Sequence, residues 1–129
     1  MRLWHTDLIP VLPKKQLLNQ WRDLNSIFVT QDKHVLINFV YDYPKNDLLC
    51  YSIAVIAEMK ARGYKVNNEK MKAYFGDEKY SIVAKPFKNK MTDHYLKQCL
   101  YNLQEKYDCG IIMHDDWIKI RCHFIRYHL

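Results

Sequence analysis

The residues best suited to do chemistry are a neighbouring base and acid, Arg22 and Asp23, in the stretch Gln16–Leu24. A carboxylate can accept and donate protons during a reaction. A guanidinium presents a planar fork of donors that matches a phosphate. A second arginine, Arg2, follows the first residue, Met1. Taken alone, Asp23 is more typical of a solvated acid on a helix surface, and Arg2 of a solvated terminus, so their surroundings must decide.

A helix positions this pair. Apolar residues recur at helical spacing over Leu17–Phe28, which predicts a helix from about residue 14 to 25. Pro13 stands at or near its first position, where the missing N–H costs little. Asp23 falls on the polar side of this helix. The prolines before it predict an extended N-terminal arm over residues 1–13.

Two further helices are predicted along the chain. The first begins at Asp47, a plausible N-cap, and ends at Gly63 after basic residues. The second runs from Thr92, also a plausible cap, to about Tyr107, and Gly110 closes it.

The remaining segments carry weaker patterns. The apolar run His34–Tyr41 is compatible with a buried helix turn or a strand. Residues 64–87 are interpreted as a long irregular connection. Over 111–129, apolar and basic residues alternate, which is typical of a strand or an extended arm. The predicted fold class is therefore all-α: a compact three-helix single domain spanning residues 1–129, with an extended or short-strand C-terminal tail.

The basic charge is concentrated in one window, Lys60–Lys90. It holds nine Lys/Arg and three acidic residues, a net +6 that equals the formal charge of the whole chain. Such a window would attract a phosphate backbone and make binding salt-dependent, and Lys85 and Lys88 are its candidate DNA contacts. A lysine-rich solvated surface explains the charge equally well.

Other function classes find little support. No secretory signal and no apolar stretch of about 20 residues is present, so we expect a cytoplasmic protein without a membrane partner. The four cysteines are scattered and are expected as free thiols. A zinc site is disfavoured because the spacing of its candidate ligands matches no standard pattern; these ligands are Cys109, His114, Cys122, His123 and His128.

Three aromatic residues near the end of the chain have two possible uses. Trp117, Phe124 and Tyr127 could stack on an unpaired base, although packing on the helices is the stronger expectation.

The stretch Gln16-Leu17-Leu18-Asn19-Gln20-Trp21-Arg22-Asp23-Leu24 resembles the catalytic helix of the pyrimidine-dimer DNA glycosylase family, which comprises the endonuclease V of phage type and its bacterial branch. The resemblance continues without a gap to Phe28 and Lys33-His34-Val35. Met1-Arg2-Leu3-Trp4-His5 and Glu58–Val66 are similar to the bacterial branch. Together these segments cover roughly residues 1–66.

The resemblance implies a bifunctional DNA glycosylase and abasic-site lyase of all-helical fold. In this family an N-terminal α-amine attacks the sugar and forms an imine, and an acid on the first helix assists. These roles fall on Met1, whose removal the bulky Arg2 should block, and on Asp23. An α-amine is less basic than a lysine amine, so more of it is neutral near pH 7. Arg2 and Arg22 would clamp phosphates.

The same resemblance places Lys33 and His34 at the DNA. A histidine beside an apolar run is also typical of a core-edge residue bonded to backbone. The implied partner is double-stranded DNA containing a lesion, bound by a monomer that needs no metal or other cofactor.

Three positions depart from the resemblance: Asp23 replaces the glutamate of the family, Arg2 stands where the phage enzyme exposes a threonine amine after methionine removal, and Ser26 replaces an arginine that contacts DNA. A non-catalytic DNA-binding protein on the same fold is the alternative, and a protein-interaction factor that does not bind DNA is a weaker one.

Overall fold

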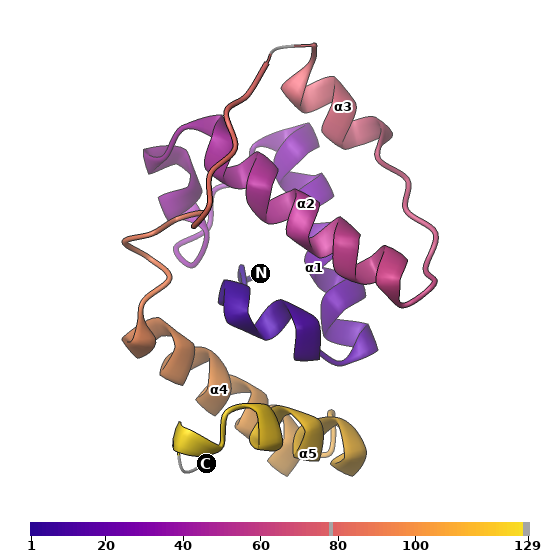
Figure 1. Cartoon of the computed structure of the whole chain (residues 1–129), viewed down its shortest axis with the longest axis vertical. Helices are drawn as coiled ribbons and strands as arrows, with labels where there is room; N and C mark the ends of the chain where they lie inside the picture. The colour runs from indigo at the N-terminus through magenta and orange to yellow at the C-terminus, as the bar shows by residue number, and fades with distance from the viewer. Residues whose placement is uncertain (78, 128–129) are drawn as a thin grey trace.

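The first residues of the chain run through the middle of the molecule, with helices packed on either side (Figure 1). A computed structural model describes the backbone of residues 1–77 and 79–127 and the side chains of 1–77 and 79–126. Within these ranges the chain is all-helical and contains no strand. The elements are η1 (Thr6–Val11), α1 (Lys14–Thr30), η2 (Asn38–Asp42), α2 (Lys45–Ala61), α3 (Glu69–Phe75), α4 (Asp93–Asp108), α5 (His114–His123) and η3 (Ile125–Tyr127), where η denotes a 3-10 helix.

The predicted all-α class is confirmed, and the three predicted helices correspond to α1, α2 and α4. Thr92 caps α4 as expected, because its side chain accepts the N–H of Tyr95 at 3.2 Å. Gly110, with a φ of 80°, follows the end of α4. α1 continues to Thr30 rather than ending near residue 25, since Ile27 and Phe28 extend its buried face by another turn.

The prediction of Asp47 as an N-cap is wrong. α2 begins two residues earlier, at Lys45, directly after Pro44. Asp47 is buried, and its carboxylate accepts the amide N–H of Phe87 at 2.8 Å. It therefore anchors the connection before α4 instead of a helix end.

The interpretation of residues 64–87 as irregular is wrong for α3. Phe75, the last residue of α3, packs edge-on against Phe28 of α1 with ring centroids 5.5 Å apart. A helix of only seven residues spans about two turns, too few for its periodicity to stand out in a lysine-rich segment.

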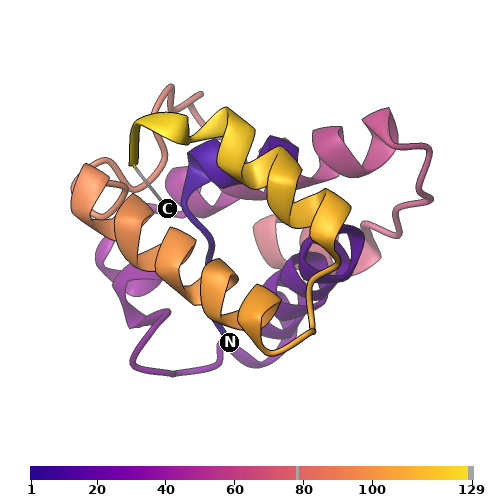
Figure 2. The ribbon, with the colours of Figure 1, turned by 90° about the horizontal axis from the view of Figure 1, so that it is seen from below.

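The predicted strand or extended arm at the end of the chain is also wrong. α5 buries Trp117 and Ile120, and Phe124 follows at the same helical spacing. Ile118 and Cys122, which suggested a strand, are exposed. Figure 2 shows α5 beside α4. The residues that α5 buries therefore recur at a spacing of three and four residues, and not at the two-residue alternation that predicts a strand.

The N-terminal arm is extended only up to His5, after which η1 forms. Leu3, Trp4, Leu8 and Ile9 are buried. The arm is thus part of the core, which draws apolar side chains from all five described α-helices. The run His34–Tyr41 forms a turn and η2. No helix in the described part of the chain combines the length and apolarity that a membrane crossing requires.

Candidate functional site

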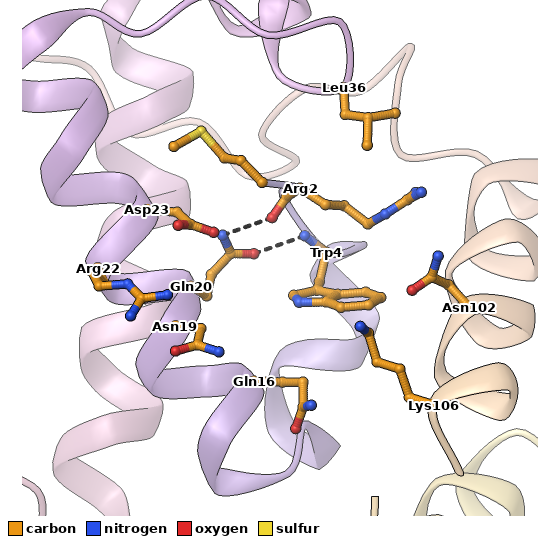
Figure 3. Close-up of a pocket in the computed structure, with 11 residues that line it drawn as sticks. Arg2, Trp4, Gln16, Asn19, Gln20, Arg22, Asp23, Leu36, Asn102 and Lys106 are labelled. Carbon is orange, nitrogen blue, oxygen red and sulfur yellow. Dashed lines mark hydrogen bonds between the residues drawn. The ribbon is translucent and has the colours of Figure 1, made fainter. Parts of the chain in front are cut away.

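A cleft of about 360 Å³ opens where the N-terminal segment lies between α1 and α4 (Figure 3). We name it the Met1 cleft. Four of the predicted site residues line it together, although they come from two separate segments: Met1, Arg2, Arg22 and Asp23. Its other lining residues are Trp4, Gln16, Asn19, Gln20, Leu36, Asn102 and Lys106.

The amide of Gln20 joins the N-terminal segment to α1. Its Oε1 accepts the N–H of Trp4 at 2.8 Å, and its Nε2 donates to the carbonyl oxygen of Arg2 at 3.0 Å (Figure 3). Gln20 is buried, and its bond to the N–H of Trp4 is sheltered from water. This bidentate contact fixes the backbone one residue after Met1.

Two tyrosines hold the same segment from its other sides. The hydroxyl of Tyr51, on α2, lies 2.6 Å from the carbonyl oxygen of Trp4 and 3.0 Å from Oε1 of Gln20. Burial raises the pKa of Tyr51 well above its usual value, so the hydroxyl keeps its proton and donates. The hydroxyl of Tyr95, on α4, donates to the carbonyl oxygen of Leu3 at 2.5 Å. Side chains from three helices thus fix the position of the N-terminal segment.

Arg2 points across the cleft toward α4 (Figure 3). Its guanidinium carbon lies 5.9 Å from the ring centroids of both Trp4 and Tyr95, within cation–π range. Arg2 is half-buried, in contrast to the solvated terminus that its position in the sequence suggests.

Asp23 is half-buried on the α1 side of the cleft. Burial raises the pKa of its carboxyl, and the charge of Asp32 adds to this increase. The positive terminal amine and Arg22 act in the opposite direction and lower that pKa. The carboxyl and the amine are therefore close enough to interact electrostatically, in surroundings that partly exclude water.

α4 contributes two polar residues that the sequence did not single out. Asn102 and Lys106 face Arg2 and Trp4 across the cleft (Figure 3). Lys106 adds a third basic side chain to those of Arg2 and Arg22. Their spacing of four residues places them on one face of α4, which is the only signal that the sequence carries for them.

Lys33 and His34 lie outside the lining of the cleft, in the loop of residues 31–37 between α1 and η2, and both are exposed. Nδ1 of His34 accepts the N–H of Leu36 at 3.2 Å. His34 therefore bonds to backbone, as the alternative interpretation expects, yet its ring remains on the surface. Leu36, from the same loop, does line the cleft.

Ser26 stabilises this loop. Its hydroxyl donates to the carboxylate of Asp32, which also accepts from the hydroxyl of Thr30 at 2.5 Å. These bonds lower the pKa of Asp32. Asp32 is thus the negative charge that acts on Asp23.

Lys85 and Lys88 are not brought to the Met1 cleft. They line a second cavity, of about 470 Å³, whose other lining residues include His5, Asp7, Cys50 and Met91. Among the described residues of the window Lys60–Lys90, none lines the Met1 cleft.

Some basic residues of that window are occupied within the fold. Arg62 pairs with Glu58 at 2.9 Å and donates to the carbonyl oxygen of Leu12 at 2.7 Å. Lys90 lies over the ring of Tyr95, 4.4 Å from its centroid. The lysines that stay exposed, among them Lys85 and Lys88, remain the candidates for DNA contacts.

The structure bears on two alternatives for the end of the chain, base stacking by aromatic residues and a zinc site. Trp117 is buried and stacks on Tyr107, with ring centroids 5.4 Å apart, and Phe124 is buried as well, so both pack on the helices. All four cysteines are free thiols. Within residues 1–77 and 79–127, no three His, Cys, Asp or Glu side chains gather as a metal site. His128 and the side chain of Tyr127 lie outside the described residues.

The segment that supplies most of the Met1 cleft matches a known protein family. Residues 1–72 match the model of a family described as pyrimidine dimer DNA glycosylase. No curated protein and no solved structure matches the chain. The matched segment covers more than half of the 129 residues and includes every lining residue of the Met1 cleft except Asn102 and Lys106. The chain therefore belongs to the pyrimidine dimer DNA glycosylase family, whose members are named for excising dimerised pyrimidines from DNA.

Proposed function

We propose that this protein removes damaged pyrimidine bases from duplex DNA and cleaves the resulting abasic site, with the α-amine of Met1 as nucleophile and Asp23 as acid–base group. The observation that carries the proposal is that these two groups meet in one cleft, where the terminal amine lowers the pKa that burial raises at Asp23. The family supports a glycosylase acting on damaged DNA. The roles of the individual residues are our proposal.

The first half of the reaction replaces the base with the protein. The neutral amine of Met1 attacks C1′ of the deoxyribose, a bond forms between nitrogen and C1′, and the glycosidic bond breaks. The base departs with the bonding electron pair and takes up a proton. The attached nitrogen then loses a proton, and the bond between C1′ and the ring oxygen breaks. The ring oxygen keeps the electron pair of that bond and takes up a proton to become the 4′-hydroxyl, which leaves a protonated imine.

The second half cleaves the strand. A base removes a proton from C2′, electrons move to form the C2′–C3′ double bond, and the 3′ phosphate leaves with the electrons of the C3′–O bond. Water then hydrolyses the imine and restores the amine. Asp23 is suited to these proton transfers, since its raised pKa brings the carboxyl closer to the working pH, and its negative form stabilises the positive imine.

The cleft also holds groups that can bind the DNA backbone. Arg22 is exposed at the rim, and Lys106 faces it from α4. Their positive charges could engage the phosphates on either side of the reacting sugar. Arg2, held over two aromatic rings, is a further candidate.

Borohydride trapping tests the nucleophile. Protein whose intact mass shows a retained and unblocked Met1 is mixed with DNA containing an abasic site, or with DNA carrying a pyrimidine dimer, and reduced. We expect a stable covalent adduct that peptide mapping assigns to the amine of Met1. No adduct with either DNA would overturn the enzymatic proposal. Salt-sensitive DNA binding without an adduct would establish the alternative, a non-catalytic DNA-binding protein.

Asp23→Asn tests the acid–base role. General acid–base groups typically contribute about 100-fold to 10,000-fold to a rate, so we expect trapping to slow within that range. Asp42→Asn is the matched control, because Asp42 is exposed and does not line the Met1 cleft. Asp23→Glu restores the acid of the phage enzyme and should retain trapping. Equal trapping rates for Asp23→Asn and Asp42→Asn would remove Asp23 from the mechanism.

A further inference from the structure

The loop of residues 31–37 ends in an apolar tip. Val35 is 82% exposed and Leu36 38% exposed, although aliphatic side chains are normally drawn into the core. Lys33 and His34 precede them directly and are exposed as well. Exposed apolar residues beside a lysine and a histidine suit a partner that presents both negative charge and apolar surface.

This tip is held in a fixed shape. The carbonyl oxygen of His34 accepts the N–H groups of Ile37 and Asn38, each at 2.9 Å. Oδ1 of Asn38 accepts the N–H of His34 at 2.8 Å, which closes the turn from the other side. The tip is therefore presented by an ordered turn, which lowers the entropy lost on binding.

The tip also lies at the proposed active site. The loop runs beside the N-terminus in both Figure 1 and Figure 2. Leu36 lines the Met1 cleft, and Figure 3 shows its side chain directed into the cleft on the side of Arg2. Val35 does not line the cleft and projects into solvent next to it.

The flanking residues point to nucleic acid as the partner. Because Nδ1 of His34 accepts a backbone N–H, the neutral ring carries its hydrogen on Nε2, which can donate to a phosphate. Lys33 supplies a positive charge beside it. A duplex presents an apolar stack of bases between its phosphates. The loop presents the complementary order, a lysine and a histidine followed by two aliphatic residues.

We propose that Val35 is a wedge that inserts between base pairs next to the damaged nucleotide, while Lys33 and His34 hold the adjoining phosphates. The inference rests on the proposed function and adds how the duplex is opened. A sugar carbon inside a stacked duplex is shielded, so an enzyme that attacks it must first distort the helix. Apolar side chains inserted at a base step unstack it and kink the DNA.

The test separates the wedge from the chemistry. Binding is measured with a duplex that carries a tetrahydrofuran abasic analogue, which cannot form an imine, next to 2-aminopurine, whose fluorescence rises when it unstacks. We expect wild-type protein to raise the fluorescence. Val35→Ala should lower this rise and weaken binding about tenfold, the loss that corresponds to two buried methyl groups. Trapping on single-stranded abasic DNA should not change.

Val29→Ala is the matched control, since Val29 is also exposed, at 57%, and does not line the Met1 cleft. It should behave as wild type in both measurements. Val35→Leu, with a longer aliphatic side chain, should preserve or increase the fluorescence.

Three results would overturn the wedge. One is equal fluorescence and affinity for Val35→Ala and Val29→Ala. Another is an equal loss of trapping on single-stranded and duplex DNA, which would mean that the substitution damages the cleft. The third is a Val35→Ala variant that binds DNA like wild type but sediments more as a monomer than wild type does. This result would assign the tip to contact with a second copy of the chain. If wild-type protein forms no covalent adduct, the proposed function is overturned. The fluorescence measurement does not depend on the adduct and still tests whether Val35 unstacks the duplex.

Discussion

At the scale of single residues, burial and charge act against each other on Asp23. Burial favours the neutral carboxyl, and the terminal amine and Arg22 favour the carboxylate, with burial the stronger. The pKa in the folded protein therefore lies above that of the unfolded chain. Ionisation then costs stability as the pH rises from the unfolded pKa through the folded one, and the cost persists at higher pH.

Asp23→Asn should accordingly stabilise the fold at neutral pH while it impairs the reaction. Because Asp23 is only half-buried and solvent screens its interactions, we expect the gain in the free energy of unfolding to be less than about 1 kcal/mol at pH 7. The gain should disappear toward about pH 3, where the carboxyl is neutral in both states. Thermal melts across this range measure it, with Asp42→Asn as control. A gain that grows toward acid pH would contradict the raised pKa.

The resemblance to a known family, and not the residue types alone, singled out four residues of this cleft, but not the groups that position them. Met1, Arg2, Arg22 and Asp23 carry the reactive or charged groups, and the structure brings them to one cleft. Gln20 is a neutral amide whose importance comes from two backbone groups 16 and 18 residues away. No local pattern marks such long-range bonds.

At the scale of elements, the extended N-terminal segment is held in place by side chains of the surrounding helices. Its backbone groups are satisfied by side chains from α1, α2 and α4 instead of by a neighbouring strand. Removing one of these partners leaves a buried polar group without a bond, which is costly.

Tyr51→Phe tests this docking. It removes the hydroxyl that lies 2.6 Å from the carbonyl oxygen of Trp4 and should lower the free energy of unfolding by about 1–3 kcal/mol. It should also slow trapping, because the amine of Met1 is held less firmly. The exposed Tyr101 offers the control Tyr101→Phe, expected within about 0.5 kcal/mol of wild type. Urea denaturation that does not distinguish the two variants would contradict the role of Tyr51.

Long amphipathic helices were predictable, whereas short or ambiguous ones were not. α1, α2 and α4 bury apolar side chains over several turns, so their periodicity is clear. α5 carries two interleaved patterns, and only packing selects between them: Trp117 and Ile120 go inward, and Ile118 goes outward. Asp115 and Asp116 in its first turn and Arg121 in its last agree with a helix dipole and are a signal that could have favoured the helix.

At the scale of the whole molecule, basic side chains line two separate cavities. Arg2, Arg22 and Lys106 surround the Met1 cleft, while Lys85 and Lys88 lie at a separate cavity. Composition revealed the excess charge but could not place it, since the distribution depends on how the helices pack. A duplex that reaches both places would cover more of the surface than the cleft alone.

The salt dependence of DNA binding measures this footprint. If Lys85 and Lys88 each contact one phosphate, the double variant Lys85→Gln/Lys88→Gln should reduce the slope of log K against log salt by about 1.8. Lys119→Gln/Arg121→Gln removes the same charge from exposed positions on α5 that line neither cavity. An equal reduction in both double variants would indicate a general effect of net charge and would argue against a DNA contact at Lys85 and Lys88.

The bond between Tyr95 and Leu3 joins residues 92 positions apart and has a consequence for how the protein is made. During translation the first residues emerge long before α4 is synthesised. The hydrogen bond that holds this segment to α4 therefore cannot form until at least 95 residues have been translated. The segment of the proposed nucleophile is thus held by α4 only after most of the chain has been synthesised, which links its positioning to the folding of the helical body.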